Sequence, residues 1–336
     1  MNIDDVCRGD SAYARSTETS HAETNLGFAA ALCCPLFILL FSVLSDSIAL
    51  RIQGLSVSIK PLVAQLLLPT ICPAALAVLA RVPRYADAAR KWHLIAVSNA
   101  CLSLLLVVSF ATAALVMQDL AVAYDAPLID TTLIHWDALL GFNWLDTERW
   151  FVAHPVAIVL ARMTYPLWTW QLALLTLHFS FKKKHVELAE FLTLFFLVTI
   201  ESILISALYP AANPYYHFGF ADHTTPTPWS DFYPLREGSE HLIDLNKHQG
   251  LISMPSMHAA GAVLYVYSAR NLGLVFYVSL IVNVLMVAGA VYCGAHYLCD
   301  IIAGLSLSIV AIIVSAASHL FDTASKRHTA ELLDDL

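Results

Sequence analysis

The stretch CGAHYLCDIIAGLSL, residues 293–307, places a histidine at the entrance of a long apolar segment and an aspartate four positions later. An earlier stretch, LISMPSMHAAGAV at residues 251–263, also ends a polar loop and begins an apolar segment with a histidine near its start. Buried ionisable groups are costly unless they are paired or serve a function. The apolar segments and polar loops around these two stretches therefore indicate both the fold and the chemistry of the chain.

The composition is that of a membrane protein. Of the 336 residues, 58% are hydrophobic and only 13% are charged, whereas soluble domains carry about 25% charged residues. Lipid must therefore be the solvent for much of this chain. The net charge of −8 and the lack of any basic pattern argue against a nucleic-acid partner.

The apolar segments predict an all-α fold, a polytopic bundle of about eight transmembrane helices. A spanning helix needs roughly 20 mainly apolar residues. The segment at 255–269 is short, and the segment at 157–181 is interrupted by Arg162 and Pro166. The eight candidate spans are 27–50, 60–80, 93–117, 157–181, 187–209, 255–269, 272–293 and 297–320.

The distribution of positive charge predicts the orientation, because cytoplasmic segments are enriched in Lys and Arg. With both termini in the cytoplasm, twelve of the 18 basic residues fall on the cytoplasmic side, among them the triple lysine at 182–184. The predicted organisation is a polar cytoplasmic tail over 1–26, which lacks the pattern of a cleaved leader, a transmembrane domain over 27–321, and a second cytoplasmic tail over 322–336.

This topology leaves two long segments on the extracytoplasmic side. Residues 118–156 contain Trp136, Trp144 and Trp150, which suit the aromatic belt at a membrane interface, and an interfacial helix is expected within 130–150. Residues 210–254 form a polar loop that leads directly into the first histidine stretch. Loops of this length are usually functional or disordered, so we take 210–254 as an active-site loop.

The two histidines are expected to open on the same side of the membrane. Asp300 follows His296 by four residues, so on a helix the two side chains share a face. A carboxylate beside an imidazole fixes its tautomer and raises its basicity. Pro255 suits a first helical turn, and the backbone N–H groups around Ser256 and His258 would form an anion pocket there. This combination favours phosphoryl transfer, in which one histidine attacks phosphorus and the other protonates the leaving oxygen.

Two motifs in this chain resemble a known family. PSMH at 255–258 and GAHYLCDIIAG at 294–304 are similar to the second and third signature motifs of the type 2 phosphatidic-acid phosphatase superfamily. The similarity is closest to its inositol phosphorylceramide synthase (inositolphosphotransferase)-like branch, whose third motif has the pattern of His296, Tyr297, Asp300, Ala303 and Gly304. The resemblance implies a six-helix phosphatase-like core over about 93–320.

The resemblance also implies roles for the site residues. It makes His296 the nucleophile and Asp300 the acid that orients it. His258 becomes the proton donor to the leaving group, and Ser256 lines the phosphate pocket. The chain departs from the phosphatase pattern at Ala290, where that pattern has an arginine, and it lacks the first motif of the family.

Because Ala290 replaces the arginine of the phosphatase pattern, the positive charge that binds phosphate needs another source. Arg236, with Lys247 second, is the candidate replacement in the 210–254 loop. The lipid-transferase branch lacks the same arginine, which favours that branch.

The sequence therefore predicts a membrane enzyme that breaks, and can re-form, phosphoester bonds of phospholipids or lipid phosphates at the extracytoplasmic face through a phosphohistidine. Water as acceptor would make it a simple lipid-phosphate phosphatase, and a hydroxyl acceptor would make it a transferase. No cofactor or metal is required, although His258, His296 and Asp300 are also acceptable zinc ligands. A transporter or non-catalytic scaffold is a further alternative, although transporters usually place polar groups near the midplane of repeated halves.

Overall fold

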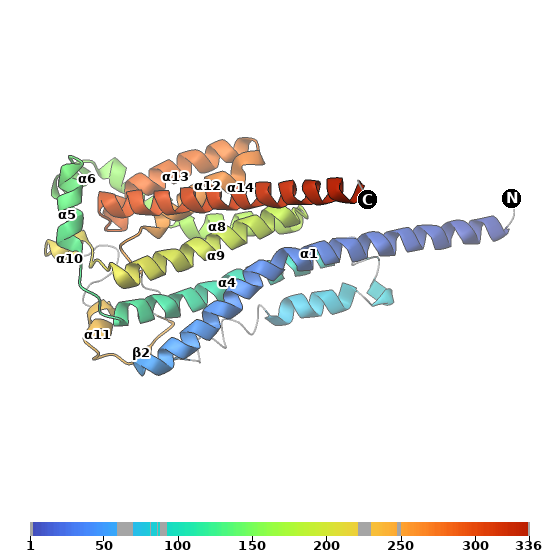
Figure 1. The fold of residues 1–336 in the computed structure, drawn as a ribbon, viewed down its shortest axis with the longest axis horizontal. Helices are drawn as coiled ribbons and strands as arrows, with labels where there is room; N and C mark the ends of the chain where they lie inside the picture. Colours follow the sequence, from blue (N-terminus) through green and yellow to red (C-terminus); the bar gives the residue numbers. More distant parts are fainter. Residues whose placement is uncertain are drawn as a thin grey trace.

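The structure is a computed structural model that describes residues 3–58, 70–80, 82–85, 87, 93–220, 230–246 and 250–334, with side chains described only within 27–318. Within these residues it is a bundle of long helices, as the composition predicts (Figure 1). The long helices are α1 (Ile3–Gln53), α4 (Leu94–Ala123), α9 (His185–Leu208), α13 (Leu274–Cys293) and α14 (Leu298–Asp334).

Five stretches of these helices are long and apolar enough to cross a membrane. They are Gly27–Gln53, Leu94–Ala123, His185–Leu208, Leu274–Cys293 and Leu298–Ser318. Each coincides with one of the eight predicted spans, so the membrane-helix fold is confirmed and the count within the described residues is five. Helix α1 begins at Ile3, so it also contains most of the segment predicted to be a polar tail.

The other three predicted spans differ from single long helices. The span at 157–181 is divided into α7 (Pro155–Thr164) and α8 (Leu167–Phe181). The break lies at Pro166, which lacks the N–H that would bond to the preceding turn of the helix. The span at 255–269 is helix α12 (Met257–Ser268), only 12 residues long. Of the span at 60–80, a helix over Thr70–Ala80 is described, and residues 60–69 lie outside the described residues.

The connecting segments contain short elements. They are the helices α5 (Asp130–Leu139), α6 (Trp144–Ala153), α10 (Pro214–His217) and α11 (Phe232–Arg236), the 3₁₀ helices η1 (Pro83–Tyr85) and η3 (Ala269–Asn271), and the strands β1 (Ser56–Val57) and β2 (Leu242–Ile243). The strands pair in parallel, with Ser56 opposite Leu242. This pairing ties the 210–254 loop to the end of α1.

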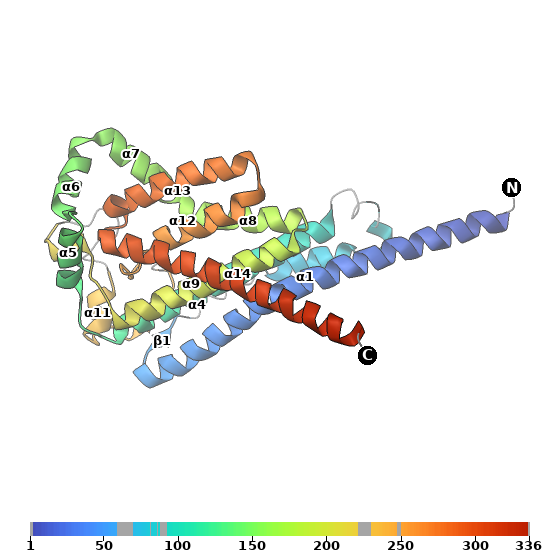
Figure 2. The same ribbon diagram turned by 45° about the horizontal axis from the view of Figure 1, so that its top comes forward.

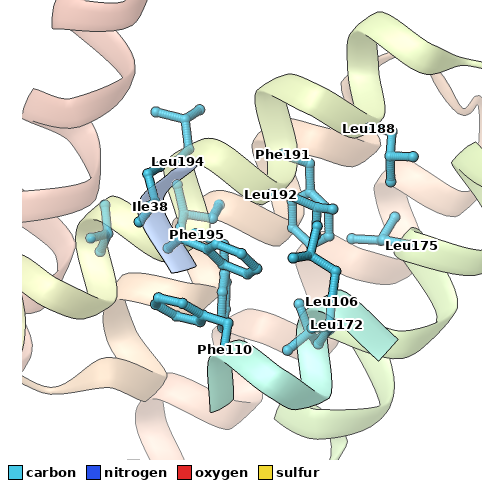
Figure 3. Close-up of a cluster of buried hydrophobic side chains, with 14 of the residues drawn as sticks. Ile38, Leu106, Phe110, Leu172, Leu175, Leu188, Phe191, Leu192, Leu194 and Phe195 are labelled. Atoms are coloured by element: carbon cyan, nitrogen blue, oxygen red, sulfur yellow. The ribbon is translucent and has the colours of Figure 1, made fainter. Parts of the chain in front are cut away.

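The largest apolar core lies where α1, α4, α8, α9 and α12 meet (Figure 3). Phe110 of α4 stacks on Phe196 of α9 with ring centroids 3.7 Å apart. Phe191 and Phe195 continue this aromatic layer along α9 (Figure 3). Because lipid tails are as apolar as these side chains, close packing rather than transfer from water holds such helices together.

The short helices α5, α6, α10 and α11 gather at one end of the bundle (Figures 1 and 2). Helix α5 runs across the ends of the long helices, near α6, α10 and α11, and α14 begins at this end (Figures 1 and 2). The two chain termini and the connection between α8 and α9 lie toward the opposite end (Figure 1). Both histidine motifs therefore open at the end that carries the connecting helices.

The aromatic-belt expectation is wrong for one of its three tryptophans. Trp136 and Trp150 are exposed, but Trp144 is only 4% exposed. Its Nε1 donates a hydrogen bond to the carbonyl of Val291 at 3.3 Å, and its ring packs edge-on against Tyr215. The segment 130–150 thus forms two helices, and α6 anchors the end of α13 through Trp144.

Candidate active site

His258 lies in the first turn of α12, as the sequence predicts. The helix begins after Ser256, a residue type preferred at helix starts because its side chain accepts an otherwise unpaired amide, here that of Ala259. The ring of His258 stacks on Tyr165 with centroids 3.8 Å apart and planes 15° apart. Trp168 lies on the same aromatic patch, with its centroid 5.5 Å from that of His258. The ring plane of His258 is therefore fixed by the break between α7 and α8.

His296 lies in the turn between α13 and α14 and is only 3% exposed. The residue before it, Ala295, has φ 51, a left-handed conformation that costs a residue with a Cβ roughly 1–2 kcal/mol. The sequence predicts His296 at the entrance of a helix over 297–320, and α14 begins at Leu298, two residues after the histidine. The side chain consequently projects from a constrained turn at the mouth of the helix.

Tyr165 brings the two histidines together. The ring of Tyr165 stacks on that of His258. A Cβ on Gly294 would lie 2.8 Å from the hydroxyl oxygen of Tyr165 and 2.6 Å from Cδ2 of His296. A side chain at residue 294 would therefore collide with both groups. Gly294 allows Tyr165 and His296 to approach each other across the turn, so the two imidazoles belong to one site.

Asp300 is buried directly behind His296. Its Oδ2 lies 3.4 Å from Nδ1 of His296, within ion-pair range but longer than the usual N–H···O distance. The same oxygen accepts hydrogen bonds from the Ser253 hydroxyl at 2.9 Å and from the Tyr297 amide at 3.0 Å. Catalytic hydrogen bonds are often long in unliganded enzymes and shorten when substrate binds.

Helices α12 and α14 are in close contact next to the two histidines. The Ser256 amide donates to the Asp300 carbonyl at 3.0 Å, and the Ser308 hydroxyl donates to the carbonyl of Ala260 at 2.8 Å. A Cβ on Gly304 would collide with the Ser256 carbonyl. The motif glycine is thus required by the packing of α14 on the start of α12.

This packing corrects the expected anion pocket. The Ser256 amide is used by Asp300, and the Ala259 amide is used by the Ser256 hydroxyl at 3.4 Å. The first-turn amides that remain for an anion are those of Met257 and His258, since the opening amides of a helix have no partner within it.

Arg236 has partners that the sequence did not suggest. It ends α11, its side chain is 9% exposed, and its Nη2 lies 2.7 Å from Oδ1 of Asp125 and 2.7 Å from the carbonyl of Ala126. Its Nη1 is buried without a hydrogen-bond partner in the described part of the chain. Lys247, the second candidate cation, lies outside the described residues.

Sequence reasoning missed several residues that shape the site. Tyr165 and Trp168 contact His258 from a distant segment, and Ser253 contacts Asp300 from the preceding loop. The one local signal was Pro166, whose break in the helix turns Tyr165 and Trp168 toward His258. Within the described residues, no group of three or more His, Cys, Asp or Glu side chains is arranged to hold a metal ion.

The fold and the site are those of a helical membrane protein with two histidines and a buried aspartate at one end of its bundle, and the family match defines its class as that of membrane phosphate-ester enzymes. The chain belongs to the PAP2 superfamily, whose sequence model matches residues 131–314, more than half of its length. Members of this superfamily are phosphoesterases that act on lipid phosphates in membranes, so the protein is a phosphoric-ester hydrolase or phosphotransferase. Comparisons with curated proteins and with solved structures found no match.

Proposed function

We propose that this protein is a lipid-phosphate phosphotransferase or phosphatase that works through a phosphohistidine at His296, on the extracytoplasmic side of the membrane. The observation that carries the proposal is the pairing of Nδ1 of His296 with buried Asp300 at 3.4 Å, beside a second histidine that Tyr165 holds in place. With Nδ1 facing the carboxylate, Nε2 is the nitrogen free to attack phosphorus.

In the first half-reaction, Nε2 of His296 forms a bond to phosphorus and the bond from phosphorus to the lipid oxygen breaks. His258 gives its proton to that oxygen, so the lipid leaves as a neutral alcohol. Asp300 stabilises the positive charge that develops on the imidazole of His296, as the carboxylate does in a Ser-His-Asp triad. General acid catalysis of this kind contributes about 10²–10⁴-fold.

In the second half-reaction, His258 takes a proton from the acceptor hydroxyl. The acceptor oxygen bonds to phosphorus as the bond to Nε2 breaks, and His296 returns to its starting state. Water as the acceptor gives a phosphatase cycle, whereas an alcohol gives a transferase cycle. The same residues serve both outcomes, so the choice depends on what binds next to the phosphoenzyme.

The phosphoryl oxygens need positive charge around them during both steps. We assign this role to the amides of Met257 and His258, to Ser256, and to Arg236, with Lys247 as the second cation. In the observed arrangement Nη2 of Arg236 is anchored by Asp125, and the buried Nη1 is the group left for a phosphate oxygen. Because the guanidinium group carries several N–H donors in one plane, Nη1 can donate to phosphate while Nη2 stays bonded to Asp125.

The finer assignment is an inositolphosphotransferase-like enzyme of lipid head groups. It is supported by the motif formed by His296, Tyr297, Asp300 and Gly304, and by Ala290 in place of the phosphatase arginine. The extracytoplasmic location is supported by the lysines at 182–184, because the α8–α9 connection lies toward the end of the bundle opposite the short connecting helices (Figure 1).

Product analysis tests this proposal. Purified protein in vesicles is given phosphatidic acid or phosphatidylinositol, with and without a second lipid alcohol. Release of inorganic phosphate alone supports the phosphatase, and transfer of a phospho-alcohol group to the added lipid supports the transferase. No turnover of either substrate by correctly folded protein would reject an enzymatic role for the site and favour a transporter or scaffold.

A further inference from the structure

Helix α5 carries two buried carboxylates on one face. Asp130 and Asp137 are seven residues apart, which is about two helical turns, and they are 4% and 2% exposed. Carboxylates are almost never this buried unless they are paired. Neither has an ion-pair partner among the described residues, so the groups that they do contact explain their burial.

Asp137 caps the helix that follows His296. Its Oδ2 accepts the amide of Leu298 at 2.9 Å, and its Oδ1 accepts the amide of Cys299 at 2.9 Å. These are the first two amides of α14, which no residue of the helix itself can satisfy. A negative charge at this end also suits the helix dipole. The cap is supplied from 161 residues away in the sequence.

Asp130 holds the residue next to His296. Its Oδ1 accepts a hydrogen bond from the fully buried hydroxyl of Tyr297 at 2.9 Å. Its two oxygens also accept the amides of Ala212 and Asn213 at 3.0 Å and 3.2 Å. Asp130 therefore links the turn that carries His296 to the start of the 210–254 loop.

The turn that carries His296 needs such support. Ala295 is held in the left-handed region, and conformations of this kind persist only when surrounding contacts impose them. The three residues that follow His296 all bond to α5, Tyr297 through its side chain and Leu298 and Cys299 through their amides. A nucleophile displaced by about 1 Å can lose on the order of 10²-fold in rate.

We propose that Asp137 is a positioning residue for His296, with Asp130 as a second anchor acting through Tyr297. In this arrangement α5 is a brace that sets the direction of Nε2. The inference rests on the proposed role of His296 as the nucleophile.

The test compares Asp137→Asn and Asp137→Ala with wild type in the full-length protein, using phosphatidic acid in detergent micelles. The asparagine keeps one acceptor oxygen and the alanine keeps none. We expect kcat to fall about ten-fold for Asp137→Asn and about a hundred-fold for Asp137→Ala, with KM within about three-fold of wild type, as expected for a misplaced nucleophile. The rate of phosphoenzyme formation in rapid-quench experiments should fall in the same proportion. Asp46→Asn in α1, another buried aspartate (5% exposed), is the matched control and should keep the wild-type kcat.

Tyr297→Phe covers the case in which the Asp137 variants do not fold, because it removes only the hydroxyl that bonds to Asp130. It should lower kcat about three- to ten-fold, an effect near that of one lost hydrogen bond, with KM unchanged. Tyr265→Phe is its control, since the Tyr265 hydroxyl is buried in the core without a hydrogen-bond partner among the described residues.

A wild-type kcat per folded molecule in either Asp137→Asn or Tyr297→Phe would overturn the brace. If kcat falls only in proportion to the folded fraction of the variant, the residue has a purely structural role, and the proposed brace is overturned as well. If His296→Ala itself stays active, the proposed function fails rather than the brace alone.

Discussion

At the scale of single residues, the site combines groups whose roles can be separated by substitution. His296 is backed by Asp300, whereas the contacts of His258 within the described residues are aromatic stacking on Tyr165 and Trp168. A carboxylate behind the imidazole suits His296 to the proposed role of nucleophile. His258, which is held by stacking, suits proton transfer. The two histidines should therefore respond differently to the chemistry of the leaving group.

The proton-donor role proposed for His258 predicts a loss of activity that depends on the substrate. Nitrophenol needs little help to leave, whereas a lipid alcohol needs a proton. We expect His258→Ala to lose about 10²-fold or more on phosphatidic acid, as for a missing general acid, and clearly less on nitrophenyl phosphate. Paired kcat/KM measurements on both substrates check this. Equal losses on the two substrates would remove His258 from the role of proton donor.

The phosphate-binding role proposed for Arg236 predicts that the activity is sensitive to a conservative substitution. Arg236→Lys keeps the charge but loses the second donor, so turnover should fall by about ten- to a thousand-fold, as for a lost oxyanion donor. Asp125→Ala is the control, because it removes only the carboxylate partner of Nη2 and leaves the bond to the Ala126 carbonyl. If Asp125→Ala and Arg236→Lys have the same effect, Arg236 acts as a structural ion pair and Lys247 becomes the next candidate.

At the scale of elements, the motif glycine sets how closely α12 and α14 approach. A methyl group at residue 304 would push α14 away from the Ser256 carbonyl and disturb the bond from the Ser256 amide to the Asp300 carbonyl. Such overpacking typically costs about 1–3 kcal/mol.

Gly304→Ala should therefore lower both the unfolding temperature and kcat. Gly250→Ala is the control, because a Cβ at that position would meet no atom of the described residues within 4 Å. Thermal unfolding in detergent and turnover of phosphatidic acid measure the two effects. A Gly304→Ala protein with wild-type stability and rate would show that the contact between α12 and α14 is not tight.

The elements also show how far the sequence could predict this molecule. Apolar runs identified all five long spans because hydropathy is a local property. Each histidine motif is likewise contained within a few residues, so it can be recognised in the sequence. The contacts of Tyr165 with His258 and of Asp137 with Leu298 join distant segments, and no local pattern encodes them.

At the scale of the whole molecule, the proposed function places the active site on the extracytoplasmic side of the membrane. The basic residues favour a cytoplasmic α8–α9 connection, which places the histidines on the opposite face. The arrangement of the helices within the bundle is the same in either orientation.

Labelling with an impermeant thiol reagent tests this orientation in intact cells. In a cysteine-depleted protein, Ser239→Cys should be labelled and Lys182→Cys should be labelled only after the cells are opened. Both positions are exposed in the structure, so access depends on the side alone. Labelling of Lys182→Cys but not of Ser239→Cys in intact cells would put the active site in the cytoplasm.

The central claim is that phosphorus passes through His296. The most direct measurement is a rapid-quench experiment with phosphatidic acid labelled in its phosphate, followed by mass spectrometry of the peptide that contains residue 296. The account predicts an acid-labile, base-stable phosphate on His296 that forms no more slowly than turnover and is absent from His296→Ala, which should be inactive. Normal turnover by correctly inserted His296→Ala protein, or phosphate on a different residue, would contradict it.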